Sequence, residues 1–152
     1  MSGSLAFHFA ADVERPLDDV FGFFRDVDQH AGRVGTVVPV YDKLTPGPVG
    51  LGTRYREVVR VLPFVQGEIV SQVVCYEPPH KLGYRFAGLG MDGELEYRFQ
   101  AVDCGTRVSQ RQILRPRGLL KQLRPLIRIT FGRVAGRRLV SIKALLEGDS
   151  PA

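Results

Sequence analysis

The chain has 152 residues, of which 44% are apolar and 24% are charged. Both fractions are ordinary for a globular protein, so we expect little disorder and a single domain that spans residues 1–152. No run approaches the roughly 18 apolar residues that are needed to cross a bilayer. The N-terminus has neither a basic region nor an apolar signal core, so the sequence favours a cytoplasmic location.

The net charge of +5 comes from one segment of the chain. Residues 115–143 contain nine Lys or Arg and no acid, whereas the rest holds twelve basic and sixteen acidic residues. The two cysteines, Cys75 and Cys104, are too few for a disulfide framework and share no metal-binding spacing with the histidines. We therefore expect reduced cysteines, no metal site and no cofactor.

The first elements are a strand and a pair of short helices. Residues 5–14 alternate with a period of two, which predicts a half-buried strand. Its apolar face carries Phe7, Phe9, Ala11 and Val13. Pro16 and the acidic residues after it suit the start of a helix, so we expect one helix at about 16–25. A second short helix is expected at about 28–34.

Six further strands follow these helices. Their expected ranges are 38–44, 53–62, 67–76, 81–87, 94–102 and 106–114. Turn-forming residues separate them, with a loop at 45–52, a hairpin loop at 88–93 and a tight turn at 103–105. A run of strands joined by short connections is typical of an antiparallel sheet.

From about residue 118 the apolar pattern changes to the period of a helix. The predicted apolar face consists of Leu120, Leu123, Ile127, Phe131, Val134, Arg138, Ile142 and Leu145. Pro125 lies inside this pattern and either kinks the helix or begins the main helix after a turn at 118–124. We favour the second interpretation. This helix must cover the apolar face of the sheet, which gives an α+β fold.

Several stretches carry a resemblance to a known family. They are Pro16–Val27, Pro48–Glu57, Tyr76–Leu82, Tyr97–Phe99, Gly105–Val108 and Leu139–Glu147. Together they resemble the START-like (SRPBCC) superfamily, in particular its polyketide cyclase/dehydrase and lipid-transport branch, over a core of about 5–147. The resemblance implies the helix-grip fold, a seven-stranded curved antiparallel sheet around a long C-terminal helix. Members bind sterols, lipids, quinones, hormones or polyketides, and only some are enzymes, so these motifs predict the fold better than the function.

A pocket between sheet and helix is the expected site. Strand alternation and the helical face predict its lining to be Tyr55, Glu57, Tyr84, Tyr97, Gln110, Gln112, Phe131, Val134 and Arg138. Glu57 needs a partner if it is buried. Either it pairs with Arg138 or a tyrosine, or, as the plainer default, Arg138 extends to the rim and Glu57 lies near an open end. Gln110 and Gln112 either orient a ligand with Tyr97, or are exposed because a bulge shifts their strand.

Three functions are compatible with these residues. The favoured one is binding, with possible transport, of a hydrophobic small-molecule ligand, either apolar or aromatic. The second is a cyclase or aromatase, in which Glu57 is the base and Tyr55, Tyr97 or Arg138 supplies the acid or the oxyanion partner. The third is an interaction module, in which the basic residues Arg117, Lys121, Arg124 and Arg128 form one stripe that meets anionic membranes or acidic partners.

The plainer interpretation of the basic stripe is a solvated outer face. The stripe could also steer an anionic ligand towards the pocket. Nucleic acid is disfavoured as a partner, because the basic residues lack interleaved aromatic residues and no nucleic-acid motif is present. The apolar segment 62–65, at an expected hairpin, is compatible with a pocket guard, a membrane contact, packing on a neighbouring loop or packing on a second subunit in a homodimer.

Overall fold

The computed structural model describes residues 4–26, 40–62 and 65–148. Its elements in chain order are β1 (Leu5–Val13), α1 (Leu17–Arg25), β2 (Val40–Lys43), β3 (Arg54–Leu62), β4 (Val65–Glu77), β5 (Lys81–Gly88), β6 (Met91–Val102), β7 (Gly105–Pro116), the 3-10 helix η2 (Gly118–Leu123) and α3 (Arg124–Leu146). The second short helix expected at 28–34 and residues 63–64 of the apolar segment 62–65 lie outside the described residues.

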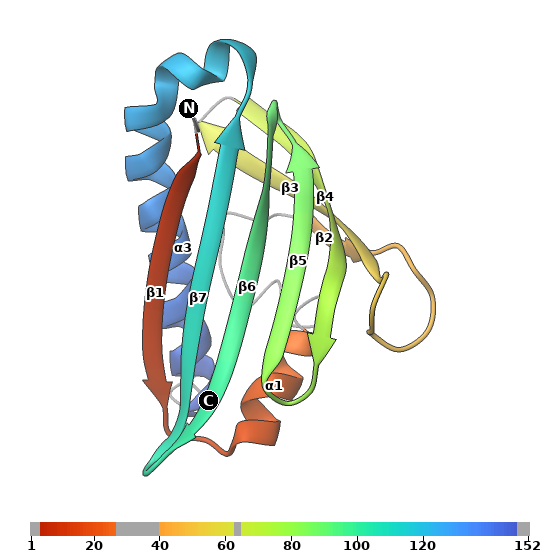
Figure 1. Ribbon diagram of the computed structural model, residues 1–152, viewed down its shortest axis with the longest axis vertical. Coiled ribbons are helices and arrows are strands. Elements are labelled where there is room, and N and C mark those ends of the chain that lie inside the picture. The colour runs from red at the N-terminus through yellow and green to blue at the C-terminus, as the bar shows by residue number, and fades with distance from the viewer. Residues whose placement is uncertain (1–3, 27–39, 63–64, 149–152) are drawn as a thin grey trace.

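The strands form one seven-stranded antiparallel sheet in the order β1-β7-β6-β5-β4-β3-β2. All neighbours except β1 and β7 are consecutive in sequence, and β1 pairs with β7 in an unbroken register from Leu5–Leu114 to Val13–Thr106. Figure 1 shows the sheet curving around α3. The predicted α+β fold, with a curved antiparallel sheet and a long C-terminal helix, is therefore confirmed.

Pro125 marks the start of the main helix, as the favoured interpretation predicted. It occupies the first turn of α3, where its missing N–H costs no hydrogen bond. The residues before it form the 3-10 turn η2 rather than a continuation of the α-helix. Gly118 begins η2 with a φ of +60°, a conformation that favours glycine.

The hairpin between β5 and β6 is tighter than the sequence suggested. The glycine-rich run at 88–93 predicted a loop, but β6 already begins at Met91. Leu89 and Gly90 form the turn with φ values of +57° and +73°, as in the two-residue turns whose twist matches that of paired strands. The other two glycines of this run, Gly88 and Gly93, belong to β5 and β6. Glycine content alone therefore overestimated the length of the loop.

The buried face of α3 is displaced from the predicted one. The buried residues are Ile127, Ala135, Leu139, Ile142 and Leu146. Leu123 was expected on this face but is 46% exposed. It belongs to η2, whose three residues per turn break the helical period before Pro125. The predicted face also omitted the buried Ala135, Leu139 and Leu146, which lie one position further along the chain than the predicted Val134, Arg138 and Leu145.

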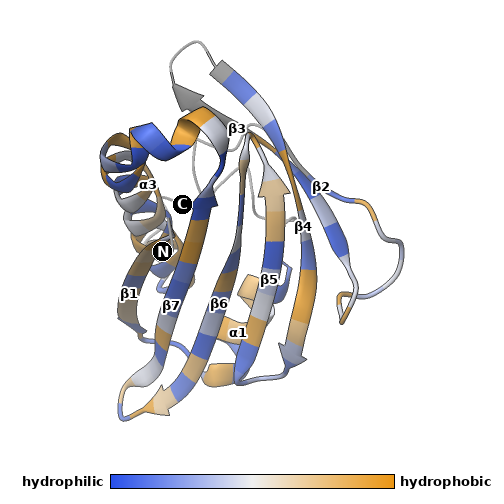
Figure 2. Cartoon of the chain, turned by 45° about the horizontal axis from the view of Figure 1, so that its top comes forward, coloured by the Kyte–Doolittle hydropathy of each residue, from blue (hydrophilic) through white to orange (hydrophobic). Residues whose placement is uncertain are grey.

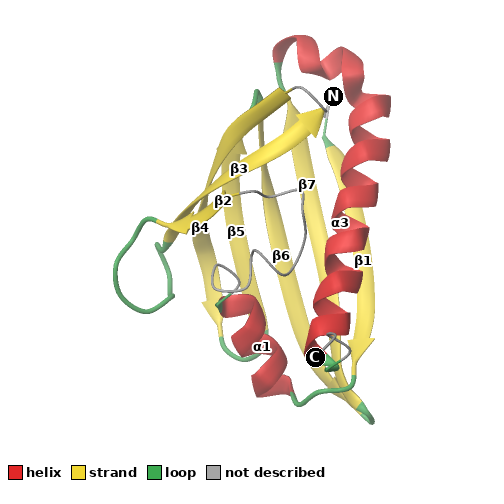
Figure 3. Ribbon diagram, turned by 180° about the vertical axis from the view of Figure 1, so that it is seen from behind, coloured by secondary structure: helices red, strands yellow, loops and turns green. Residues whose placement is uncertain are grey.

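The helix α3 approaches β1 closely at two glycines. A Cβ atom on Gly132 would lie 3.5 Å from the ring of Phe7, and one on Gly136 would lie 3.4 Å from the ring of Phe9. Figure 3 shows the consequence, with α3 running along the β1 side of the concave face and α1 near the C-terminal end of α3. The helix therefore covers one side of the sheet more closely than the other.

The core consists of two apolar clusters at opposite ends of the sheet–helix space. The α1 cluster includes Phe21, Phe24, Tyr97, Phe99 and Ile142. The η2 cluster consists of Leu5, Phe7, Ile69, Phe86, Met91, Leu114 and Ile127. Phe9 and Leu95 are only partly buried and pack against both clusters. The space beside these two residues is where the core is least complete.

Candidate functional site

Polar side chains from several elements meet on the concave face of the sheet. We call them the inner polar group: Tyr55, Glu57, Tyr84, Tyr97, Gln110 and Arg138. The tyrosines and Gln110 are no more than 5% exposed. The register of β7 with β1 and β6 is continuous through Gln110 and Gln112. The alternative that a bulge exposes these two glutamines is therefore wrong, and the predicted inward placement is confirmed.

Glu57 and Arg138 form an ion pair across the sheet–helix space. Glu57 Oε1 lies 3.8 Å from Arg138 Nη1, and the two side chains are 15% and 27% exposed. This separation is too long for a direct hydrogen bond. Burial raises the pKa of the Glu57 carboxyl, and the positive charge of Arg138 only partly opposes this effect. The structure thus combines both interpretations, because the two groups pair while keeping some access to solvent.

Tyr84 carries a buried hydroxyl that is available for hydrogen bonding. Its Oη has no hydrogen-bond partner among the described residues, although the side chain is 5% exposed. Burial is the main cause that raises the pKa of Tyr84 well above 10, and the nearby Tyr97 and Tyr55 hydroxyls add to it. Burial also raises the pKa of Tyr97. Both phenols are therefore neutral at physiological pH and able to donate a hydrogen bond.

Leu95 shows that the described side chains fill the space between sheet and helix only in part. It lies on an interior strand, between Tyr84 of β5 and Gln112 of β7 in the register, and it packs against both core clusters. An inward leucine at this position would be fully buried in a filled core. Instead Leu95 is half-buried, as are Phe9 and Gln112 on the same concave face. Solvent therefore reaches the middle of the concave face.

The helix supplies the opposite wall. Phe131, Val134 and Arg138 are spaced three and four residues apart, so they share one face of α3. All three are half-buried, Phe131 packs against the η2 cluster, and Arg138 reaches β3. The structure thus places the predicted helix residues on the side that faces the inner polar group.

The predicted lining omitted Phe9, Leu95 and Ser71. Ser71 is 7% exposed and lies opposite Tyr55 in the register of β3 and β4. It shares the inward face of β4 with Ile69 and Val73, which are also buried. Strand alternation is the signal that could have found all three residues.

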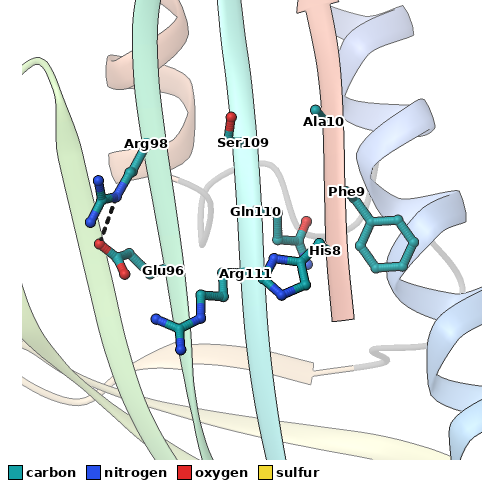
Figure 4. Close-up of a pocket in the computed structure, with 8 residues that line it drawn as sticks. All are labelled: His8, Phe9, Ala10, Glu96, Arg98, Ser109, Gln110 and Arg111. Atoms are coloured by element: carbon teal, nitrogen blue, oxygen red, sulfur yellow. Dashed lines mark hydrogen bonds and ion pairs between the residues drawn. The ribbon is translucent and has the colours of Figure 1, made fainter. Parts of the chain in front are cut away.

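The convex face of the sheet carries a separate hollow of about 430 Å³. Figure 4 shows the residues that line it: His8, Phe9, Ala10, Glu96, Arg98, Ser109, Gln110 and Arg111. Burial acts to raise the pKa of Glu96, but hydrogen bonds from Lys81 and Arg98 outweigh it and lower the pKa. These ion pairs are those of a solvated sheet surface, so this hollow is not our candidate site.

A second hollow of about 630 Å³ follows the line where β1 meets α3. Phe9 and Leu139 contribute to it, together with the small residues Ala10, Gly132 and Gly136. The hollow is present because these small side chains do not fill the space between β1 and α3. In the described part of the chain, no three His, Cys, Asp or Glu residues gather as metal ligands, and no helix is long and apolar enough to cross a membrane.

The predicted basic stripe is exposed, but it does not form a single line. Arg117, Lys121, Arg124 and Arg128 all face solvent. Arg117 is engaged by Asp92, with 2.5 Å between Nη2 and Oδ2. The prediction assumed one α-helical period, whereas η2 turns more tightly than α3. The residues are surface cations, as expected, but in a different arrangement.

Comparison with known families identifies the fold's relatives. A family model described as polyketide cyclase / dehydrase and lipid transport matches residues 5–147. The chain belongs to this family. The predicted START-like relationship is thereby confirmed over nearly the whole length. No curated protein matches the chain in sequence.

Solved structures of other proteins share the fold at low sequence identity. Zhui aromatase/cyclase from Streptomyces sp. R1128 superposes with a TM-score of 0.83 at 16% identity, covering 98% of this chain and 97% of that one. The di-domain ARO/CYC BexL from the BE-7585A biosynthetic pathway gives 0.77 at 22% identity, over 95% of this chain and 50% of that one. A protein from Thermus thermophilus gives 0.78 at 16% identity, over 97% of this chain and 100% of that one. At these identities the likeness establishes the helix-grip fold.

Proposed function

We propose that this family member binds an apolar or aromatic small molecule between the concave sheet face and α3. The observation that carries the proposal is the incomplete burial of Leu95, an inward side chain on an interior strand. A solvent-reached apolar wall in the middle of a sheet is unfavourable unless a ligand covers it.

The chemistry of the surrounding residues supports a ligand that is mostly apolar with one or two oxygen groups. Phe9, Leu95 and Phe131 supply apolar contact area. The Tyr84 hydroxyl and the Gln110 amide are buried donors that can meet a carbonyl or hydroxyl. A ligand oxygen at Tyr84 would satisfy a hydroxyl that otherwise lacks a partner among the described residues.

A melting assay across lipids, quinones and aromatic polyketides tests this proposal. A ligand that binds only the folded state raises the free energy of unfolding by about 2.7 kcal/mol at a hundred times its dissociation constant. Native mass spectrometry would identify the bound species. Failure of every class of compound to bind, together with an experimental structure whose interior is filled, would reject the proposal.

Tyr84→Phe separates a binding role from a structural one. Removing an unsatisfied buried hydroxyl should leave the ligand-free protein as stable or more stable by about 1 kcal/mol. Loss of the hydrogen bond should weaken ligand binding roughly fivefold to tenfold. The matched control is Tyr76→Phe, because Tyr76 packs on Phe21 with ring centroids 5.8 Å apart, outside the inner polar group. Equal ligand affinity in both variants would rule out the role of Tyr84.

A second candidate function is supported by the raised pKa of Glu57. A carboxylate destabilised by burial is a stronger base, and closure of a polyketide ring needs a base that removes a proton from a carbon beside a carbonyl. Arg138 could stabilise the resulting oxyanion, and Tyr84 or Tyr97 could donate the proton. Glu57→Gln should abolish turnover while ligand binding persists. A variant that retains turnover would exclude Glu57 as the base.

A further inference from the structure

One end of the molecule exposes large apolar side chains. Leu119 and Leu123 of η2 are 82% and 46% exposed, and Leu126 and Ile129 of α3 are 49% and 54% exposed. Figure 2 shows hydrophobic and hydrophilic residues side by side along this part of the ribbon. Four exposed aliphatic side chains therefore lie within eleven residues of the chain.

The same segment is rich in cations and free of acids. The exposed cations are Lys121, Arg124, Arg128, Arg133 and Arg137. None of them forms an ion pair with another described residue, in contrast to Arg117, which is held by Asp92. No Asp or Glu occurs between Asp103 and Glu147. The charge on this surface is therefore not neutralised locally.

Exposed apolar residues share the outward side of α3 with two of these cations, Arg133 and Arg137. Leu126, Ile129 and Arg133 are spaced three and four residues apart, so they lie on one stripe of α3. The buried residues Ala135, Leu139 and Ile142 lie on the other side, against the sheet. The stripe continues to Val140, which is 67% exposed. This stripe of apolar and basic residues is therefore accessible to a partner.

We propose that this apolar–basic surface docks on an anionic lipid bilayer. The leucine and isoleucine side chains would enter the interface between headgroups and acyl chains, and the exposed cations beside them, such as Arg133 and Arg137, would contact the lipid phosphates. The proposal stands on surface composition and does not depend on what the inner polar group binds.

Charge argues against the other occupants of this surface. In a twofold dimer the same patch meets itself, so the unpaired cations of one copy would face those of the other with no described acid between them. A nucleic acid would be expected to find exposed aromatic residues to stack on, but Phe131 is the segment's one aromatic residue and it is half-buried against the η2 cluster. Isolated apolar side chains between cations fit a fluid, anionic interface best.

Docking would bring the η2 end of the sheet–helix space to the membrane. The Arg117 N–H donates to the Gly90 carbonyl over 2.9 Å, which fixes η2 against the β5–β6 hairpin. Leu120 packs on the same hairpin beside Gly90 and against the η2 cluster. The proposed docking surface is therefore a rigid continuation of the core and not a separate tail.

Vesicle co-sedimentation of the full chain tests the proposal. We expect binding to phosphatidylcholine vesicles that contain about one quarter phosphatidylglycerol, weak binding to pure phosphatidylcholine, and loss of binding in high salt. Equal binding to both vesicle types, or no binding to the anionic ones at low salt, would overturn the proposal. So would self-association through this surface in sedimentation equilibrium without vesicle binding.

Two sets of variants locate the contact. Lys121→Gln, Arg133→Gln and Arg137→Gln together should weaken binding about 100-fold, because each cation near a bilayer contributes about fivefold. The matched control removes the same charge from the outer face of the sheet, at the exposed Arg54, Arg85 and Arg111. This control variant should weaken vesicle binding far less. An equal loss of binding in both variants would show that only the net charge matters, and would overturn the proposed surface.

The second set tests the apolar contribution. Leu126→Ser with Ile129→Ser should weaken binding to anionic vesicles about tenfold, because two partly inserted aliphatic side chains are lost. Both residues are exposed, so the unfolding transition should not move. Unchanged vesicle binding by a folded double variant would overturn the docking surface as drawn.

Discussion

Glu57 shows how one residue acquires its properties from residues distant in sequence. Alternation along β3 turns it inward, but its pKa depends on burial beneath α3 and on the charge of Arg138. Because burial is the larger effect, the folded state holds the Glu57 proton more tightly than the unfolded state does.

This shift sets the sign of a pH dependence. Well below the ordinary pKa of 4.5, Glu57 is protonated in both states. As the pH rises through the raised folded pKa, ionisation costs the folded state more, so stability is lost. The free energy of unfolding of the wild type, relative to Glu57→Gln, should therefore fall as pH rises from below 4.5. Urea unfolding at a series of pH values measures this difference.

Glu147 provides a control of opposite sign. Hydrogen bonds from Lys143 and from the Glu14 backbone N–H lower the pKa of Glu147. Its contribution to stability should be present above its ordinary pKa and lost as the pH falls through the folded pKa. The wild type, relative to Glu147→Gln, should thus gain stability with rising pH. If Glu57 showed this same sign, the pairing with Arg138 would outweigh burial.

At the residue level, the sequence predicted the direction of each strand side chain better than it predicted which side chains contact each other. Alternation correctly turned Tyr55, Glu57, Tyr84 and Gln110 inward, because side-chain direction in a strand is local. It left open whether Glu57 pairs with Arg138, and that was settled by the distance between β3 and α3. The predicted lining omitted Ser71, because a small polar side chain gives no clear signal of burial in a pattern of apolar and charged residues.

At the level of elements, α3 meets β1 at two glycines. Gly132 and Gly136 lie in the helix interior, where glycine is unfavourable by about 1 kcal/mol relative to alanine. A Cβ atom on either glycine would lie at an ordinary contact distance from the rings of Phe7 and Phe9. The helix–sheet contact therefore leaves room for alanine at these positions.

Two glycine substitutions should have opposite effects. Gly132→Ala places a Cβ 3.5 Å from the Phe7 ring, an ordinary contact, and should raise the free energy of unfolding by about 0.5–1 kcal/mol. Gly93→Ala places a Cβ 2.7 Å from the Phe86 ring and against the Ile113 carbonyl, and should lower it by about 1–3 kcal/mol. Denaturant unfolding of both variants measures the difference. A destabilised Gly132→Ala would mean that the helix cannot tolerate added volume at β1.

The elements themselves were predictable where the pattern was regular. The strands and the start of α3 at Pro125 follow from alternation and from proline chemistry. The buried face of α3 was less predictable, because Leu139 and Leu146 beside the predicted face give an equally apolar pattern and only the packing selects between them. The length of the loop around Leu89–Gly90 was overestimated, because glycines within strands resemble those of loops in the sequence.

At the level of the whole molecule, the two core clusters stabilise opposite ends of the sheet–helix space. The α1 cluster joins α1 and the C-terminal half of α3 to β6 and β7, and the η2 cluster closes the other end. Between them, the concave face near Leu95 stays accessible to solvent. This arrangement stabilises the fold from both ends while it leaves the middle for a ligand.

The same arrangement predicts a gradient of local stability. Amides of β6 and β7, which pair on both sides and lie near the clusters, should exchange with deuterium most slowly. Amides of β2, a four-residue edge strand, should exchange fastest among the strands. Bound ligand should slow exchange in β5 and β6 around Leu95. Hydrogen–deuterium exchange with peptide resolution checks both patterns, and fast exchange throughout β6 would contradict the two-cluster core.

The sequence by itself determined the fold class, the order of elements and the inward faces of the strands, because these depend on local periodicity and on turn chemistry. The tertiary structure decided which faces meet. Only the packing of α3 against β1 places Arg138 opposite Glu57, leaves Leu95 half-buried and turns Leu126 and Ile129 outward. These features depend on the volumes that fill or fail to fill the space between elements, and no local pattern encodes that sum.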